Sequence, residues 1–507
     1  MFKAKQVEIE AKYENIALLY KNEAEHLGFF AGDRIKIINP KTEMFITCVL
    51  KLIEQQVAKG SSKKIRLAPG EIGLLGKAIE KLGVYENERV HVLPAKKPKS
   101  LEYVKKKFQG YPFEEQELHE IVDDIVNNKY SEVETTYFVT ACAVQDLSIK
   151  EITFLTKAMV GVGRQLDFKK NTHDIIVDKH CIGGIPGNRT TLVVLPIAVA
   201  AGLTMPKTSS RAITSPAGTA DTMEVLTHVD LTLSQMHKVV AEVGGCLVWG
   251  GNLDLSPADD IIIQVEHPLE IDSEGQMIAS ILSKKKSVGS THILLDIPIG
   301  STAKVKTYQD ALRLQDKFEK VAQALGMQVV VIITDGNAPI GKGIGPLYEA
   351  LDVMKVLRNE EGSSVLREKS LIMAGLVLEM AEKSKKGEGY AKAKEILESG
   401  RALAAFEKII KAQGAKKIPA FGKYKHVVKA KSEGVISAID CRKISKLAFI
   451  LGAPKDVSAG LILYKTIQDE VKKGEVLFEM YTNSSQKLDY GKAYVQDNVF
   501  FSTNPFS

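Results

Sequence analysis

The pattern of hydrophobic and polar positions first predicts a small β-rich domain. Residues 1–93 contain short runs in which apolar and polar positions alternate, such as DRIKIINP (33–40) and MFITCVLKLI (44–53). A period of two is typical of strands with one buried face. The segment PAKKPKS (94–100) combines prolines with lysines, so we expect a solvated linker at the end of this domain.

From residue 101 to about residue 170 the hydrophobic period becomes helical. Two capping boxes support this interpretation, Ser131 with Glu134 and Ser148 with Glu151, because each precedes an apolar stripe. In a capping box the serine side chain accepts from a backbone amide of the first helical turn, and the glutamate accepts from the backbone amide of the serine. The region therefore predicts a helical domain.

An α/β region is predicted from residue 174 to about residue 345. Its strands are expected at five continuous apolar runs, which are typical of strands buried on both faces: DIIVD (174–178), LVVL (192–195), GCLVW (245–249), HILLDIP (292–298) and QVVVIITD (328–335). Helix-length segments separate these runs. Within this region, residues 273–286 predict an amphipathic helix with Ser273 and Gln276 as its capping box.

The last part of the chain changes pattern again. Residues 346–413 are helical in period, whereas the tail from 425 to 507 returns to short strands and turns. Its strand-like runs are GVISAID (434–440), GLILYKTIQ (460–468) and GEVLFEMY (474–481). We expect a compact α+β or β-sandwich-like domain here.

Composition and charge narrow the class of protein. A chain of 507 residues predicts two to four domains. Lys and Arg exceed Asp and Glu by six (68 against 62) without a concentrated basic segment, which favours small anionic substrates and argues against a nucleic-acid-binding protein. The five cysteines show no C-x-x-C spacing, so we expect a reduced, cytoplasmic protein. The amino terminus lacks an apolar signal core, and no uninterrupted apolar run approaches the ~20 residues that span a membrane, so we expect neither secretion nor membrane insertion.

The first candidate site is KHCIGGIPGNRTT, residues 179–191, which follows the apolar run DIIVD. Lys179 and His180 offer charged or neutral donors, glycines such as Gly184 allow close backbone approach, and Thr191 adds a hydroxyl near an expected helix start. It is not an ATP-binding P-loop, because Asn188 stands where that motif needs glycine. The segment predicts an anion loop, with an ordinary strand-to-helix turn as the alternative.

The second candidate site is SSRAITSPAGTADTME, residues 209–224. Six Ser and Thr residues and Arg211 are available there to bind a second anionic or sugar-like group. The alternative is a solvent loop in which Thr219 or Asp221 serves only as a helix N-cap.

The third candidate site lies in EIDSEGQMIASILSKKKSVGS, residues 270–290. Ser280 and Lys284 are four residues apart and share a helix face, while Asp272 precedes the helix and is a candidate general acid. The alternative is that Asp272 or Ser273 only caps the helix.

Two further segments are weaker candidates. Lys304 follows a predicted strand and is placed to reach a phosphate, and the glycine-rich segment TDGNAPIGKGIG (334–345) is expected to line a cleft. The histidines show no spacing typical of a metal site, so we expect no metal.

Taken in this order, these stretches resemble the thymidine phosphorylase family, also called the class II nucleoside phosphorylases. DKHCIGGIPGNRTT (178–191) looks like that family's phosphate loop, D-K-H-S-x-G-G, and the second candidate site resembles its signature S-G-R-x-L-x-x-T-G-G-T-x-D-x-x-E. LDLSPADD (253–260) and SILSKK (280–285) are similar to further family segments. The resemblance covers roughly residues 101–507 and is closest to a long subgroup that includes the AMP phosphorylases.

The resemblance implies an α/β multidomain fold in which a helical lobe built from separated segments is hinged to an α/β domain. The implied domains are an N-terminal β-rich domain (1–93), a helical domain (101–173, joined by 261–290), an α/β phosphate-binding domain (174–260 and 291–420) and a C-terminal α+β domain (425–507). Family members of this kind are generally homodimers or larger homo-oligomers.

The resemblance also assigns roles to residues. Asp272 and His180 are implied to be catalytic, with Asp272 protonating the departing base, and Lys179 and Thr191 are implied to bind phosphate. The implied substrate-binding residues are Gly184, Ser210, Arg211, Ala212, Ile213, Thr214, Ser215, Thr219, Ser280, Lys284 and Lys304. Two positions depart from the family. Cys181 replaces a serine, and the arginine that holds the pyrimidine in thymidine phosphorylases falls near Gln264 and Val265, neither of which is basic.

The implied reaction is phosphorolysis of the N-glycosidic bond of a nucleoside or a nucleoside 5′-monophosphate. Inorganic phosphate is the expected co-substrate, and no other cofactor, nucleic acid or membrane is expected. The missing arginine favours a substrate that carries its own phosphate. The resemblance implies a role in nucleotide salvage or pyrimidine metabolism. From the basic loops alone, a phosphate-binding regulator or a kinase-like enzyme is the alternative.

Overall fold

The computed structural model describes residues 1–7, 15–54, 67–168, 174–212, 215–269, 271 and 273–505. These residues form two compact units. The first unit contains Met1–Gly163 and Ser256–Ser283, and the second contains Arg164–Leu255 and Lys284–Ser507. The chain therefore leaves the second unit once, after Leu255, and returns to it within a single helix.

The N-terminal part of the first unit is a closed six-stranded barrel with the strand order β1-β5-β2-β4-β3-β6. Its elements are β1 (Phe2–Val7), β2 (Ile16–Tyr20), α1 (Lys21–His26), β3 (Arg34–Ile38), β4 (Phe45–Ile53), β5 (Glu71–Leu75), α2 (Gly76–Leu82) and β6 (Arg89–Pro94). Alternate apolar side chains, such as Ile35 and Ile37, fill the interior. The strands predicted at 33–40 and 44–53 are thus present.

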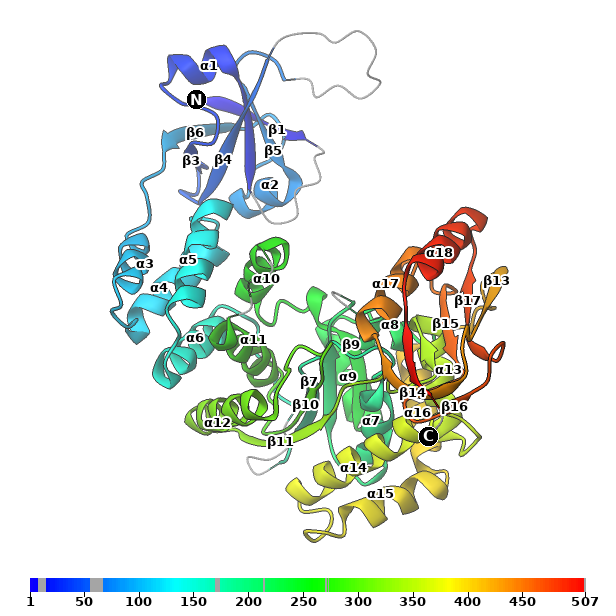
Figure 1. Ribbon diagram of the computed structural model, residues 1–507. Helices are drawn as coiled ribbons and strands as arrows, with labels where there is room; N and C mark the ends of the chain where they lie inside the picture. Colours follow the sequence, from blue (N-terminus) through cyan, green and yellow to red (C-terminus); the bar gives the residue numbers. More distant parts are fainter. Residues whose placement is uncertain are drawn as a thin grey trace. The chain divides into compact units, whose positions relative to one another are not determined.

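The rest of the first unit is helical, and Figure 1 shows its first helices as a cyan group. The helices are α3 (Ser100–Phe108), α4 (Glu115–Val126), α5 (Glu132–Val144), α6 (Ile149–Gly161), α10 (Pro257–Leu269) and α11 (Glu274–Ser287), the last of which continues into the second unit. Both predicted capping boxes form, at Ser131 with Glu134 and at Ser148 with Glu151. The predicted helical part of the fold is therefore present.

The second unit is built on parallel strands. Strands β11, β10 and β7 form one parallel sheet, β8 and β9 form another, and an isolated parallel bridge between Ile176 and Thr204 links the two. Figure 1 shows β7, β10 and β11 side by side, with α12 packed next to β11. The strands are β7 (Val177–Cys181), β8 (Met205–Ser209), β9 (Gly245–Trp249), β10 (His292–Ile299) and β11 (Gln328–Asp335).

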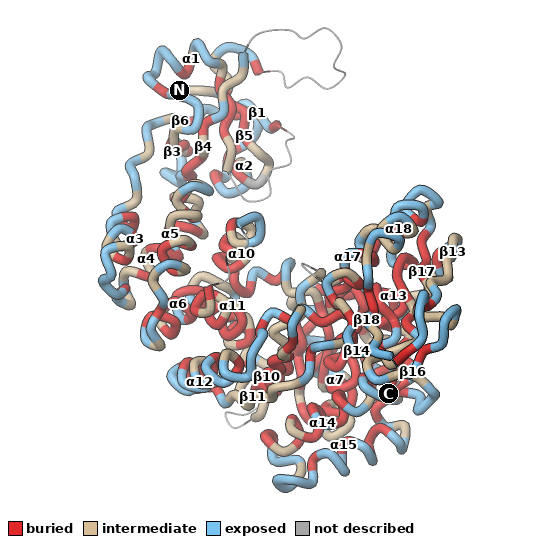
Figure 2. The backbone as a smooth tube through the Cα atoms, viewed as in Figure 1, coloured by how far each residue is buried: buried red, intermediate tan, exposed pale blue. Residues whose placement is uncertain are grey.

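Helices cover these sheets. They are α7 (Thr190–Ala200), α8 (Thr219–Glu224), α9 (Leu233–Val243), α12 (Tyr308–Ala324), α13 (Pro346–Leu357), α14 (Ser364–Met380), α15 (Gly389–Glu398) and α16 (Arg401–Gln413), with a short 3-10 turn at Gly250–Asn252. Figure 2 shows the backbone around α7 buried, whereas α12 and α15 carry many exposed residues.

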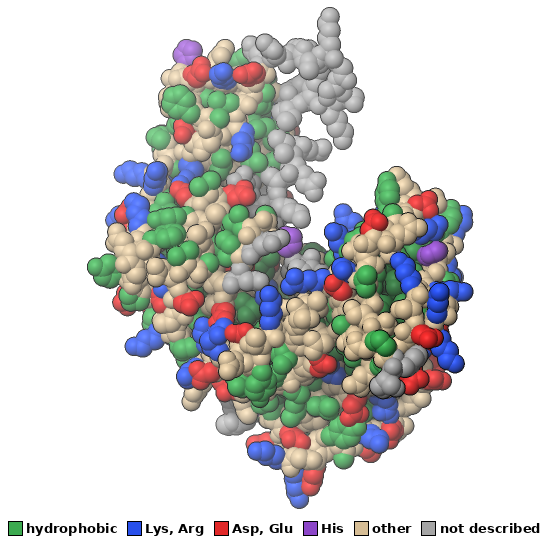
Figure 3. Space-filling model, in the orientation of Figure 1, with side chains coloured by type: hydrophobic (Ala, Val, Ile, Leu, Met, Phe, Trp, Pro, Cys, Tyr) green, Lys and Arg blue, Asp and Glu red, His purple; other side chains and the backbone are tan. Residues whose placement is uncertain are grey.

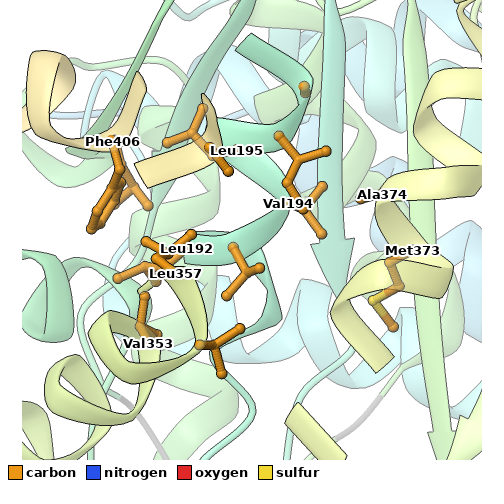
Figure 4. Packing of buried hydrophobic residues seen from close by; sticks show 14 of the residues in the cluster. Leu192, Val194, Leu195, Val353, Leu357, Met373, Ala374 and Phe406 are labelled. Atoms are coloured by element: carbon orange, nitrogen blue, oxygen red, sulfur yellow. The ribbon is translucent and has the colours of Figure 1, made fainter. Parts of the chain in front are cut away.

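The predicted strand at LVVL (192–195) is wrong, because these residues lie inside α7. Every residue from Thr190 to Ala198 is buried, so the helix has no polar face and no helical period in its sequence. Leu192 packs beside Val353 and Leu357, and Leu195 lies on the side of Phe406 (Figure 4). A short apolar run cannot by itself distinguish a buried strand from a buried helix. The run DIIVD is also only partly a strand, since β7 begins at Val177.

The C-terminal part of the second unit mixes strands and helices. It contains β13 (Tyr424–Lys429), β14 (Gly434–Ile439), α17 (Cys441–Leu451), β15 (Gly460–Leu463), β16 (Glu470–Val471), β17 (Val476–Thr482), α18 (Ser485–Asp497) and β18 (Phe501–Asn504). The short strand β12 (Gly343–Ile344) pairs with β15 and so joins this part to the α/β sheet region. No described helix has both the length and the apolar character needed to cross a membrane.

Candidate functional site

The loops that the sequence singled out follow the carboxyl ends of parallel strands. Residues 182–189 follow β7, residues 210–218 follow β8, residues 300–307 follow β10, and residues 336–342 follow β11. In open parallel sheets this edge is where ligands bind, because the loops and helix N-termini converge there. The second unit therefore brings together four of the five segments that sequence analysis proposed, all except the segment at 270–290.

These loops lie in direct contact with one another. Gly184 has a φ of +93°, and a side chain there would start 3.5 Å from the backbone nitrogen of Lys304. Gly187 has a φ of +71°, and its Cβ position lies only 2.8 Å from the backbone nitrogen of Gly341. Glycine is required at Gly187 because any other residue would be strained and would clash with backbone. The glycines therefore hold the loop after β7 against the loops after β10 and β11.

Lys179 is buried on β7 rather than exposed in the loop. Its Nζ donates to Thr190 Oγ1 at 2.8 Å and lies 3.8 Å from Asp296 Oδ2. Burial lowers the pKa of Lys179, and the neighbouring Lys369 adds to this effect, although the charge of Asp296 opposes it. Thr191 is also buried, at the start of α7 as predicted. The contact of Lys179 and Thr191 with phosphate stays a prediction.

Asp296 is the buried centre around which this side of the site is organised. Its carboxylate accepts from Thr334 Oγ1 at 2.6 Å and lies 3.3 Å from Lys369 Nζ. Burial alone would raise its pKa, but the ammonium groups of Lys179 and Lys369 lower it, and the net pKa is below its ordinary value. Sequence analysis assigned Asp296 no role. The available signal was a single acidic residue inside HILLDIP, an otherwise apolar buried strand.

His180 lies on the opposite face of β7 from Lys179, because side chains alternate along a strand. Desolvation lowers its pKa well below the ordinary value, and the nearby Lys285 and Lys207 lower it further. The imidazole is therefore neutral at pH 7 and can donate through one ring nitrogen while accepting through the other. This arrangement favours a hydrogen-bonding role for His180 over a cationic one, and its predicted part in catalysis stays a prediction.

A second buried ionic cluster lies on the face of β7 that carries His180. Asp178 Oδ1 is 3.2 Å from Lys207 Nζ on β8, and Asp178 Oδ2 is 2.8 Å from Lys285 Nζ on α11. Lys207 Nζ also donates to the carbonyl oxygen of Thr208 at 2.6 Å. Burial is the main reason that the pKa of Lys207 falls to about 7. The cluster was not identified from the sequence, where Asp178 and Lys207 again appear as single charges in strands.

The segment after β8 is folded by Asp221. Its Oδ2 accepts from the backbone nitrogens of Ala212 and Gly218, at 2.7 and 2.8 Å. The N-cap of α8 is Gly218, so neither Thr219 nor Asp221 occupies that position, although Asp221 completes the cap from the third helical position. Ser210 is exposed, and Ser215 donates to the carbonyl of Ala217. Ile213 and Thr214 lie outside the described residues.

Arg211 is held by acidic side chains from the same region. It forms ion pairs with Asp221 at 3.2 Å, with Asp230 at 3.3 Å and with Glu224. Its guanidinium also lies 4.8 Å from the ring centroid of Trp249, a cation–π geometry. Three carboxylates offset its charge, so the geometry favours Arg211 as an organiser of the segment. Its predicted contact with substrate stays a prediction.

Arg189 connects the two loops and was not assigned a role from the sequence. Its Nη1 donates to Thr219 Oγ1 at 3.1 Å, its Nη2 donates to the carbonyl of Ala217, and its Nε pairs with the buried Glu349 of α13. A planar guanidinium can hold several acceptors at fixed angles, which fixes the loop after β7 against the segment after β8. Its place beside the predicted phosphate loop was the only signal in the sequence.

The remaining predicted residues lie on or near α11 and on the loop after β10. Ser280 and Lys284 share one half-buried stripe of α11, as their spacing predicts, but Ser280 belongs to the first unit and Lys284 to the second. Lys304 is exposed. Asp272 lies outside the described residues. The backbone amide of Gln276 donates to Ser273 Oγ at 3.4 Å. Among the described residues the side chain of Gln276 has no hydrogen-bond partner, so only half of this predicted capping box is seen.

The two family departures have simple surroundings. Cys181 accepts from Asn188 Nδ2 at 3.3 Å, and burial raises the pKa of its thiol to about 11, so it is protonated and not a reactive thiolate. Gln264 donates to the carbonyl of Asp260 within α10, and Val265 is buried.

Charged side chains are mixed rather than grouped in the part of the chain that the structure describes. Among the described residues, no three His, Cys, Asp or Glu side chains are grouped as metal ligands. On the face that Figure 3 shows, basic and acidic side chains are interspersed over most of the surface. Nucleic-acid-binding proteins usually concentrate basic side chains on one face.

Comparison with protein families gives three matches. Residues 173–403 match the glycosyl transferase family a/b domain, residues 101–163 match the glycosyl transferase family helical bundle domain, and residues 435–501 match the pyrimidine nucleoside phosphorylase C-terminal domain. These ranges include the loops at the carboxyl edge of the sheet.

Similar proteins and structures agree with these matches. A protein of Rhodopseudomonas palustris named "Putative thymidine phosphorylase" is 48% identical over 440 residues, which cover 86% of this chain and 85% of that protein. One of the same name from Legionella pneumophila is 43% identical over 486 residues, covering 95% of this chain and 91% of its own length. The fold is similar to that of anthranilate phosphoribosyltransferase from Thermus thermophilus, with a TM-score of 0.53, 20% identity, and coverage of 61% of this chain and 98% of that one.

Proposed function

This chain belongs to the thymidine phosphorylase family, and on that premise we propose that it catalyses phosphorolysis of nucleoside 5′-monophosphates. The family matches and the relatives support a pentosyltransferase that acts on a nucleoside with phosphate. Beyond this class of reaction, we propose that the substrate is a nucleotide rather than a nucleoside.

An excess of buried positive charge carries the proposal of a nucleotide substrate. Close to the loops at the carboxyl edge of the sheet, four buried lysines accompany two buried carboxylates, an excess of two positive charges when all four lysines are protonated: Lys179, Lys207, Lys285 and Lys369 against Asp178 and Asp296. Buried charge without a counterion is costly, so anions are expected to complete the site. Inorganic phosphate supplies one anion, and a 5′-phosphate on the substrate supplies a second. The absence of a basic residue at Gln264 and Val265 agrees with this choice.

The proposed reaction balances without another co-reactant. An oxygen of inorganic phosphate forms a bond to C1′ of the sugar while the bond from C1′ to the base nitrogen breaks. The base leaves with that electron pair and takes a proton from a general acid. A nucleotide yields free base and ribose 1,5-bisphosphate, whereas a nucleoside would yield a pentose 1-phosphate. The proposal includes no metal or organic cofactor.

The proposed roles follow the family resemblance and the contacts at the loops. Asp272 donates the proton to the base, while neutral His180 hydrogen-bonds the sugar. Lys179 supplies positive charge to the attacking phosphate. Lys304, whose loop adjoins Gly184, is proposed to pair with the substrate phosphate. Ser280 and Lys284 are proposed to orient the base. We further propose a cytoplasmic homodimer or larger homo-oligomer.

The test is an assay of base release by the purified full chain. Inorganic phosphate would be supplied with AMP, CMP, UMP, uridine or thymidine, and free base would be measured by chromatography. We expect phosphate-dependent release from at least one monophosphate, with a higher kcat/KM than for its nucleoside and no loss of activity after treatment with a chelator. Release from nucleosides alone would reject the nucleotide substrate. No release from any of them would reject phosphorolysis, and a requirement for ATP would favour a kinase-like enzyme.

A further inference from the structure

The cluster of Asp178, Lys207 and Lys285, called here the Asp178 cluster, joins three segments that are distant in sequence. Asp178 belongs to β7, Lys207 to β8 and Lys285 to the part of α11 in the second unit. Both lysines contact the carboxylate of Asp178, and Lys285 Nζ also lies 3.5 Å from the carbonyl oxygen of Thr208 on β8. The helix is therefore tied to two neighbouring strands at one buried point.

Each member of the cluster stands close to a predicted substrate residue on its own segment. Asp178 precedes His180 by two residues on β7, and Lys207 on β8 precedes Ser210 by three residues. On α11, Lys285 directly follows Lys284. His180 also projects to the same face of β7 as Asp178, because side chains two residues apart on a strand share a face. A shift at the cluster would therefore move all three predicted substrate residues.

The energetics make Asp178 the critical member. The side chains of Asp178, Lys207 and Lys285 are 1%, 4% and 4% exposed, so water cannot replace a lost partner. If the carboxylate is removed, two buried ammonium groups face each other without an offsetting charge, and their repulsion is strong in a poorly solvated interior. The two ammonium groups must then separate or one of them must lose its proton. Either response breaks the contacts that hold the lysines together, so the strands and helix that carry them are expected to shift.

Phosphate binding is expected to be independent of this cluster. Lys179 projects to the other face of β7, where Thr190 and Asp296 hold its ammonium group. Its partners come from α7 and β10, neither of which contributes to the Asp178 cluster. Loss of Asp178 leaves these contacts in place.

We infer that Asp178 is a positioning residue for the nucleoside part of the substrate, acting through Lys207 and Lys285 on the segments that carry His180 and Lys284. The inference rests on the proposed phosphorolysis, and it adds that the two faces of β7 have different tasks in substrate binding. One face of β7 positions the nucleoside part and the other face the attacking phosphate. Asp178 itself is not assigned a contact with substrate.

The test compares Asp178→Asn with Glu151→Gln in the full chain. Both changes replace a buried carboxylate that holds a lysine by an amide, but Glu151 lies in the helical part of the first unit, away from the predicted binding segments in sequence. For Asp178→Asn we expect the KM for the nucleotide to rise by about tenfold or more, since displacements of about 1 Å can cost up to about a hundredfold. The Kd for inorganic phosphate should change by less than about twofold. Glu151→Gln should alter neither constant per folded molecule.

Binding can be followed without turnover through Trp249. It is the only tryptophan in the chain and lies beside Arg211, so its fluorescence should report nucleotide and phosphate binding separately. A purely structural defect would lower the fraction of active protein, and it would weaken the binding of nucleotide and of phosphate to the same extent. Equal changes for nucleotide and phosphate, or a result like that of Glu151→Gln, would overturn the inference.

A second pair of variants covers the case in which Asp178→Asn does not fold. Lys285→Arg keeps a cation within reach of Asp178 and should restore most of the nucleotide affinity that Lys285→Met loses. If the two variants bind nucleotide equally well, the cluster does not position that part of the substrate. The wild-type assay separates the two hypotheses, because absent base release rejects the proposed function, whereas active wild type with unaffected cluster variants rejects only the positioning role.

Discussion

In the helical part of the first unit one buried carboxylate meets one ammonium group, whereas in the second unit Asp178 meets two. Glu151 Oε1 accepts from Lys107 Nζ at 2.7 Å and from the backbone nitrogen of Phe113 at 2.9 Å, while its Oε2 accepts from the backbone nitrogen and Oγ of Ser148, both at 2.8 Å. The charges of this pair balance, and both oxygens are hydrogen-bonded. The pair links α3 to α6 and is explained by the fold alone.

The Asp178 cluster follows a different rule. Its two lysines share the one carboxylate of Asp178. In the sequence, Asp178 directly precedes Lys179 and His180. An unequal number of buried charges costs stability unless another ion is bound. A buried ion pair with balanced charges can be explained by its contribution to folding alone. An excess of buried charge of one sign, next to loops at the carboxyl edge of a sheet, indicates a bound ligand of the opposite charge.

The largest expected effect concerns the balanced pair. Lys107→Met leaves the buried carboxylate of Glu151 without its ammonium partner, and the free energy of unfolding should fall by about 3–5 kcal/mol. Thermal and urea unfolding followed by circular dichroism would measure the loss. Kinetic constants per folded molecule should stay unchanged. A loss below about 1 kcal/mol would show that the pair contributes little and would weaken the comparison.

A smaller effect should appear when the surplus charge of the second unit is neutralised by an anion. Inorganic phosphate at roughly a hundred times its Kd should stabilise the folded protein by about 2.7 kcal/mol, measured from unfolding curves that follow Trp249 fluorescence. Lys107→Met should retain this phosphate effect, and Lys179→Met should lose most of it. If Lys179→Met were stabilised as strongly as wild type, the buried ammonium of Lys179 would not contribute to anion binding.

The smallest effect is a pH dependence specific to the unbalanced cluster. The folded-state pKa of Lys207 is lowered to about 7 from 10.5, so between these values the unfolded chain binds more protons than the folded one. Stability contributed by this group therefore rises with pH, by about 1 kcal/mol between pH 7 and pH 8.

Lys207→Met should lack this rise, as the difference between its urea unfolding curves and those of wild type at the two pH values would show. Glu151 should contribute nothing to it. Burial alone would raise the pKa of Glu151, but Lys107 and backbone donors give a net lowered value, so the group stays ionised throughout this range. Parallel pH profiles for wild type and Lys207→Met would contradict the assignment.

Local sequence patterns predicted the elements that depend on local contacts. The capping boxes at Ser131 and Ser148 form because their partners lie three residues away in the chain. The run at 192–195 was misread because α7 is buried on all sides and its sequence has no helical period.

The candidate site was predicted as loops but not as a charge network. Sequence analysis found the glycine-rich loop at 179–191 and the segment at 209–224, and the structure places both at one edge of the sheet region. It did not find Asp296 or the Asp178 cluster. A single charge in an apolar strand indicates a buried partner but does not identify it, because that partner can come from any part of the chain.

Short stretches of sequence were enough to predict the helix caps at Ser131 and Ser148, about half of the strands, the two candidate loops and the family resemblance. Only the tertiary structure decided that Lys207 and Lys285 meet at Asp178, and that Lys179 and Lys369 meet at Asp296. The reason is physical. Buried charges find their partners through the packing of strands and helices, and no spacing along the chain records which ones will meet.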